Sequence, residues 1–291
     1  MRKVYVISAI SILVISLFII LCNTFKGNNK EEVVYSVKTY YSYLASDEVD
    51  LSIRLYSTND NSLLLYSKEA VVMLHDKKLE NMILVNVTDI YNSGTALYKN
   101  TTLYEYELIV NLKTDTLLIE ECYLKITFPN NEYDFNIGKL EIKPKEYDYE
   151  FINFTNLYGV SDDELLKGIV CTIKNDSKSD IVITNISIGD SFFMYLNNSN
   201  KTEVNESSYI NDYIDSNAID ISLSNPLYIN SDSNETFIIP IIYLEELYLY
   251  NFYMLIEMNG ELYYFNNFIY IDSNDLNSIS NYVSKGLRYG I

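Results

Sequence analysis

The stretch YMLIEMNGELYYFNNFIY, residues 253–270, carries the strongest fold signal in the chain. At its centre stand Asn259 and Gly260, and both residue types readily adopt the positive φ that a type I′ turn requires. Aromatic and apolar residues, which favour strands, flank this pair on both sides. The stretch therefore predicts a β-hairpin, with one strand over 253–258 and the next over 261–270.

The rest of the chain repeats this pattern of short strands and turns. Apolar or alternating runs occupy residues 31–45, 51–57, 62–67, 70–74, 82–91, 103–112, 117–128, 133–142, 167–173, 181–188 and 235–243. Turn-forming residues separate them, among them Asn92-Ser93-Gly94 and Pro129-Asn130-Asn131. Many short strands of this kind predict an all-β protein built from sandwiches. The runs 167–173 and 181–188 are predicted to pair with each other.

Lys143-Pro144-Lys145-Glu146 is the best candidate for a domain boundary, because polarity rises there and proline interrupts strand pairing. We expect one β-sandwich over 31–146 and a second over 147–291, with a long polar loop at 197–217. Around 170–271, a turn after a strand, the Leu-Glu-Glu-Leu segment at 244–247 and the terminal hairpin resemble the last strands of an immunoglobulin-like domain in architecture.

Two short segments of the second predicted domain favour helix instead of strand. Ser161-Asp162-Asp163-Glu164 matches a capping box, so a short helical turn is expected to follow it. Asp272 to Asn274 could cap another short helix, with Leu276, Ile279 and Val283 on one side.

Residues 1–30 contain an uncharged apolar run from Val4 to Leu21, preceded by Arg2 and Lys3. A helix of that length rises roughly 27 Å, close to the thickness of a bilayer core. Residues 4–21 therefore predict a transmembrane anchor in the cell membrane, crossing once, with everything after it on the extracytoplasmic side. A lipoprotein lipidated at Cys22 is the alternative, although the bulky Leu21 departs from the usual lipobox; a cleaved signal peptide is the third.

The chain is strongly acidic, with a formal net charge of −19. Such a balance excludes nucleic-acid binding through phosphate neutralisation and opposes binding to anionic lipid head groups. The wealth of Asn, Lys and Ile, together with 29 Tyr and no Trp, is typical of a bacterial protein from an AT-rich genome.

The search for catalytic residues is mostly negative. The only histidine is His75, which we expect at a surface or turn edge, and the chain has none of the common nucleophile, phosphate-loop or dinucleotide motifs. We therefore expect no enzyme activity, no cofactor and no metal site. Acidic turns at Asp162-Asp163-Glu164, at Asp232 with Glu235, and at Asp272 with Asp275 could bind calcium, but solvated turns are the simpler interpretation.

Two of the three cysteines, Cys122 and Cys171, alternate with apolar residues and are predicted to be small buried side chains. A disulfide between them is possible in an oxidising compartment, but they fall in different predicted domains.

These observations predict a membrane-anchored, extracytoplasmic binding or scaffolding module with an unknown protein or glycan partner. A carbohydrate-binding surface protein is the main alternative, with Tyr248, Tyr250 and Tyr263 as candidate exposed aromatic residues. A hydrolase that uses two carboxylates, or an accessory subunit of a membrane complex, are further alternatives.

Overall fold

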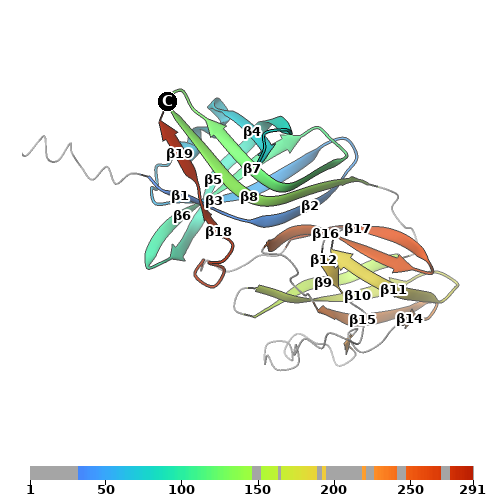
Figure 1. Cartoon of the computed structure of the whole chain (residues 1–291). Helices are drawn as coiled ribbons and strands as arrows, with labels where there is room; N and C mark the ends of the chain where they lie inside the picture. Colours follow the sequence, from blue (N-terminus) through green and yellow to red (C-terminus); the bar gives the residue numbers. More distant parts are fainter. Residues whose placement is uncertain are drawn as a thin grey trace, which may run out of the picture. The chain divides into compact units, whose positions relative to one another are not determined.

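The computed structural model describes residues 32–145, 152–162, 165–188, 192–194, 218–220, 226–240, 247–269 and 276–290. These residues lie mostly in β-strands, and a large sheet joins most of them, which confirms the all-β prediction (Figure 1). The predicted anchor 4–21, Cys22 and the polar loop 197–217 lie outside the described residues. No helix within the described ranges is long and apolar enough to cross a membrane.

The first part of the chain contains strands β1 to β8 and a 3-10 helix. Their bounds are β1 Val34–Val37, β2 Thr39–Ala45, β3 Val49–Ser57, η1 Leu63–Glu69, β4 Val71–Asp76, β5 Met82–Tyr98, β6 Thr101–Leu112, β7 Leu117–Thr127 and β8 Asn131–Pro144. The strand interpretation of residues 31–45 is confirmed, with a break at Lys38 between β1 and β2.

The later part contains strands β9 to β19. Their bounds are β9 Ile152–Asp162, β10 Leu165–Asn175, β11 Ile181–Ile188, β12 Phe192–Met194, β13 Ala218–Asp220, β14 Leu227–Ile229, β15 Ser233–Pro240, β16 Tyr248–Met258, β17 Glu261–Ile269, β18 Val283–Lys285 and β19 Leu287–Gly290.

The hairpin predicted around Asn259-Gly260 is confirmed. Met258 on β16 pairs with Glu261 on β17, and φ is 52° at Asn259 and 83° at Gly260. Both turn residues therefore adopt the positive φ that was predicted from their residue types.

The large sheet has the strand order β12-β11-β16-β2-β8-β7-β4-β5-β6-β3-β1-β18, and β19 pairs with β8 beside this path. Figure 1 shows β4, β7, β8 and β19 next to one another. The pairs β2·β8 and β2·β16 are parallel, so β2 joins the first part of the chain to the hairpin strand β16. A second sheet has the order β13-β15-β10-β9.

Residues Val34–Ile291 form one compact unit with two apolar cores. One core lies among β1 to β8. The other is lined by strands β10, β11, β14 and β16, and it also takes in side chains from the predicted first domain, among them Tyr40, Tyr56 and Tyr98. Strands β18 and β19 return from the C-terminal part to pair with β1 and β8. The boundary at 146 remains a prediction, and these contacts cross it.

Local hydrogen bonds correct two predictions for the first part of the chain. Residues 62–67 were expected to form a strand, but they begin the 3-10 helix η1, because Ser62 Oγ accepts from Leu64 N at 3.1 Å and Ser67 Oγ donates to Leu64 O at 2.6 Å. The predicted turn at residues 92–94 lies inside β5, where it forms a bulge while pairing with β6 continues on both sides.

Three predictions for the later part are also wrong. Asp162 pairs with Leu165, so a β-hairpin connects β9 to β10 where a capped helix was expected. Strand β10 pairs with β9 and β15, not with β11, because β11 pairs with β12, β14 and β16. Residues 276–282 form turns, not a helix, although Leu276 and Ile279 are buried as their spacing predicted.

A bulge at Gly138 changes which residues of β8 face outward. Tyr133, Phe135 and Ile137 point into the core before the bulge, whereas Leu140 and Ile142 do so after it. Gly138 has φ of +103°, and a Cβ atom there would lie 2.2 Å from Thr39 O, so glycine is required. The Asn136 side chain supports the bulge by accepting from Gly138 N at 2.9 Å.

Candidate functional site

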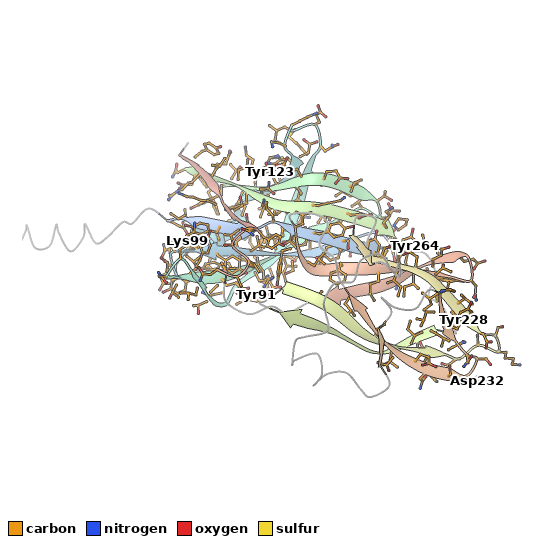
Figure 2. The ribbon with its side chains drawn as sticks, turned by 60° about the horizontal axis from the view of Figure 1, so that its bottom comes forward. Tyr91, Lys99, Tyr123, Tyr228, Asp232 and Tyr264 are labelled. Atoms are coloured by element: carbon orange, nitrogen blue, oxygen red, sulfur yellow. The ribbon has the colours of Figure 1, made fainter. Side chains whose placement is uncertain are left out.

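One outward-facing surface of the large sheet brings together apolar, aromatic and charged side chains from several strands. Burial alternates along β7: Cys122, Leu124 and Ile126 are buried, whereas Tyr123 and Lys125 lie on the opposite side. Tyr123 is labelled in Figure 2. Cross-strand pairing then places residues of β5, β4, β8 and β19 on the same side as Tyr123. We call this set the outer face: Val71, Met73, His75, Met82, Leu84, Tyr123, Lys125, Thr127, Glu132, Asp134, Asn136, Leu287 and Tyr289.

Large apolar side chains flank the outer face on two sides. On β4 and β5, Val71 is 56% exposed, Met82 59% and Leu84 73%. On β19, Leu287 is 57% exposed and Tyr289 48%. Several large apolar side chains exposed on one regular sheet face are unusual, because strand residues normally place apolar groups in the core.

His75 lies on the outer face, between the apolar β5 flank and the polar residues of β7 and β8. Its Nδ1 contacts Asp76 O at 2.7 Å and its Nε2 contacts Asp134 Oδ1 at 3.3 Å. The ring stacks on Tyr123 with centroids 5.4 Å apart. His75 lies at a turn edge as expected, one residue before the end of β4, but the alternative of a surface position is wrong, since Tyr123 and the strand pairing leave it only 4% exposed.

A hydrogen-bonded group adjoins His75. Tyr123 donates its hydroxyl proton to Glu121 Oε1 at 2.6 Å, Asn136 Nδ2 donates to the same oxygen at 3.3 Å, and Lys77 Nζ lies 3.2 Å from Glu121 Oε2. The Tyr123 hydrogen bond is the main cause of a lowered pKa for Glu121. Burial, followed by the bond to Glu121, raises the pKa of Tyr123 to about 12.

The charges of this surface are locally paired. Lys125 Nζ lies 2.7 Å from Glu132, Lys77 Nζ lies 3.2 Å from Glu121, and His75 Nε2 contacts Asp134. The outer face therefore combines exposed apolar groups with ion pairs on and beside it, although the whole chain carries −19. This composition is typical of a surface that contacts another macromolecule.

A second polar group lies buried where β2, β8 and β16 meet. Glu141 is 2% exposed; its carboxylate accepts hydrogen bonds from Tyr40 and from Tyr253, the latter at 2.9 Å, and Lys143 Nζ lies 3.8 Å away. Because Tyr253 belongs to β16, one carboxylate connects the first part of the chain to the hairpin strand. Its burial and bonding suit a structural junction.

The tyrosines proposed for sugar binding are not exposed. Tyr248 is fully buried beside Tyr282, and Tyr263 is 9% exposed and donates its hydroxyl proton to Glu261, so this prediction is wrong for both. The side chain of Tyr250 lies outside the described residues. Both tyrosines belong to strands that pack on the second core, which explains their burial.

The prediction that Cys122 and Cys171 are buried is confirmed. Cys122 and Cys171 are both 0% exposed and carry free thiols, so the structure contains no disulfide between them. Burial raises the pKa of the Cys122 thiol, and it raises the pKa of Cys171 to about 12.

The proposed calcium turns are only partly within the described residues. Asp232 lies in an exposed turn with φ of 55°, whereas Asp163, Glu164, Asp272 and Asp275 lie outside the described ranges. Searching the described residues gives no group of three or more metal-ligating side chains.

The sequence did not reveal the apolar flanks of the outer face. Residues Val71 to Leu74 form an unbroken apolar run, so alternation could not separate the buried Val72 and Leu74 from the exposed Val71. The apolar run at 82–85 is ambiguous for the same reason. The length of the run was the only feature from which a strand could be predicted there.

No protein-family model matches this chain, and no curated protein is similar to it in sequence.

Proposed function

We propose that this protein is a membrane-anchored, extracytoplasmic binding or scaffolding module. In this proposal, two immunoglobulin-like β-sandwiches follow a transmembrane helix at residues 4–21, and the outer face is the binding surface for another protein. The single observation that carries the proposal is the set of exposed apolar side chains on β4, β5 and β19. The apolar charge-free run after Arg2 and Lys3 supports the anchor.

A protein partner fits the outer face because its flanks are apolar and its polar side chains already bond to one another. Burying Leu84 and Leu287 against a partner would remove apolar surface from water, at about 25 cal/mol per Å². The ion pair Lys125–Glu132 and the His75–Asp134 contact would form the polar part of such an interface.

Site-specific photo-crosslinking tests this surface in the full-length, membrane-bound protein. A photoreactive amino acid at Val71, Leu84 or Leu287 is expected to crosslink one partner, and Leu84→Arg is expected to abolish the crosslink from Val71. Matched control positions are Tyr228 on β14 and Leu262 on β17, which are 63% and 52% exposed; their strands pair with β11 and β16, which are not outer-face strands. Figure 2 labels Tyr228. Equal crosslinking from the control positions would contradict the proposal.

A glycan is the second candidate ligand. The observation that favours it is Tyr289, whose half-exposed ring lies directly across from Glu132 on β8, so an aromatic surface stands beside a carboxylate acceptor. Binding on a glycan array that is lost in Tyr289→Ala would support this candidate. The absence of any array signal would remove it.

The membrane arrangement has its own test at the N-terminus. Mass spectrometry of the mature protein is expected to find an intact, unmodified segment containing residues 4–21. A lipid on Cys22 would replace the transmembrane helix with a lipid anchor, and cleavage before Asn23 would remove the anchor altogether.

A further inference from the structure

The last described strands form a strap along two sheet edges. We use the name strap for residues 283–290, which comprise β18, Gly286 and β19. Tyr35, Ser36 and Val37 of β1 pair with β18, and residues 131–134 of β8 pair with β19. The strap therefore closes two strand edges that belong to the first part of the chain.

The strap is held mainly through its backbone. From Val283 to Tyr289 no side chain is buried, and Val283 alone packs partly against a core. Just before it, Leu276 and Ile279 are 1% exposed, so the preceding turn is firmly packed. Segments with few buried apolar contacts open at low free-energy cost, and here that opening would begin between Tyr282 and Val283.

The surface beneath the strap is apolar and closely matched to it. Gly286 lies against the Phe135 ring so closely that a Cβ atom would stand 2.3 Å from it. The Arg288 guanidinium lies 5.7 Å from the centroid of Tyr133 and donates to Asn131 Oδ1 at 2.9 Å and 3.2 Å. Tyr133 and Phe135 stack with centroids 5.8 Å apart and are at most 1% exposed. Opening would expose both rings and two strand edges.

The register identifies the kind of strand that fits this edge. The strap sequence VSKGLRYG carries Lys285 and Arg288 and no acidic residue, whereas the chain as a whole has a net charge of −19. On the receiving strand β8, Asp134 pairs with Leu287, Tyr133 with Arg288 and Glu132 with Tyr289. The edge therefore fits a basic strand that places a glycine against Phe135 and an arginine over Tyr133.

We propose that the strap is exchanged between two copies of this protein. In the exchanged dimer, residues 283–290 of each copy occupy the β1 and β8 edges of the other, and they make the same contacts that they make within one chain. Such symmetric exchange of an identical element forms a dimer without requiring a new interface. The proposal does not depend on the proposed function, because it concerns the strand edges and not the outer face's partner.

Cysteine pairing between two differently labelled copies tests the exchange. Glu132 and Tyr289 are direct partners in an antiparallel pair, so their Cα atoms lie within the distance range that a disulfide spans. Full-length E132C and isotope-labelled Y289C, both with Cys22→Ala, are mixed under native conditions and oxidised with copper–phenanthroline. We expect a covalent heterodimer whose linked peptides join position 132 of one copy to position 289 of the other.

A matched pair in the middle of a sheet supplies the control. Asp50 on β3 and Asn111 on β6 are also direct partners near the surface, but both belong to strands that are paired along their length. Mixing D50C with N111C is expected to give no linked heterodimer. In the exchanged dimer, the double variant E132C/Y289C should form this disulfide between the two copies, whereas an unexchanged monomer would form it within one chain. A 132–289 linkage no more abundant than the control linkage would overturn the proposal.

Discussion

Strand β8 lies in two different environments. Comparing them shows why some of its outward-facing polar side chains remain exposed while others are buried. Before Gly138, its outward residues Asp134 and Asn136 lie on the outer face and remain partly open to solvent. After Gly138, its outward residues Lys139 and Glu141 are at most 5% exposed. The residue types are similarly polar in both parts.

The difference arises from what lies beside each part of β8. The first part pairs with the short edge strand β19, which leaves the outer face uncovered. The second part pairs with β2, and there Tyr253 of β16 reaches Glu141. Polar residues on a strand can therefore serve as surface or as internal junction, depending on their neighbours and not on their own chemistry.

The largest expected effect comes from removing the bulge that divides the two parts. Gly138→Ala would place a methyl group against the Thr39 backbone at a φ of +103°, so we expect a loss of about 4 kcal/mol in the free energy of unfolding. Urea denaturation measures this loss. Gly260→Ala is the control: its φ is also positive, at +83°, but nothing lies within 4 Å of the added Cβ, so about 1 kcal/mol is expected. Equal losses in the two variants would refute the steric explanation.

The buried junction should give the next largest effect. Glu141→Ala leaves the hydroxyls of Tyr40 and Tyr253 without the carboxylate that now accepts from them, so we expect a loss of about 3 kcal/mol. Glu48→Ala, at an exposed position, should change stability by less than about 0.5 kcal/mol. Chemical denaturation of both variants provides the comparison, and a small effect at Glu141 would show that the junction is dispensable.

Local sequence signals predicted the parts of this fold that depend on neighbouring residues. The Asn259-Gly260 turn was predictable because two adjacent residues determine its backbone conformation. Burial of Cys122 and Cys171 followed from simple alternation along each strand. These features need no knowledge of which other strand lies beside them.

The junction and the outer face were not predictable, because they depend on residues far apart in the chain. Lys139 and Glu141 would be surface residues by alternation alone, and their burial requires β2 and Tyr253, which lies 112 residues after Glu141. The burial of His75 was missed for the same reason, since the ring that covers it comes from Tyr123 on β7. In both cases strand pairing order, not local pattern, decides exposure.

Stability at extreme pH should depend on the Tyr123–Glu121 hydrogen bond, which lies on β7 beside the open part of β8. The pKa of Tyr123 is raised to about 12, so its contribution is present below about pH 10 and is lost as pH rises through 12. The pKa of Glu121 is lowered, so its contribution is present above about pH 4.3 and is lost as pH falls. We expect Tyr123→Phe to weaken both dependences, because it removes their shared hydrogen bond.

Thermal unfolding measured from pH 3 to about pH 13 checks this behaviour, because that range extends below the ordinary pKa of a glutamate and above the raised pKa of Tyr123. Tyr228→Phe is the matched control, because Tyr228 is exposed and lies on β14, which pairs with β11 and not with an outer-face strand. A Tyr123→Phe profile identical to that of the unmodified protein would show that the Tyr123–Glu121 hydrogen bond does not contribute to stability.

The smallest stability effect is expected on the outer face, and this is what a binding surface requires. Leu84 is 73% exposed, so Leu84→Ala should change the free energy of unfolding by less than about 0.5 kcal/mol. Leu124, which is fully buried on β7, should lose about 3 kcal/mol when changed to alanine, because a cavity remains in the core. Denaturation curves for the two variants make the comparison directly. A large loss for Leu84→Ala would mean that its side chain stabilises the fold itself, and the outer face would then lose its most exposed apolar residue as evidence for binding.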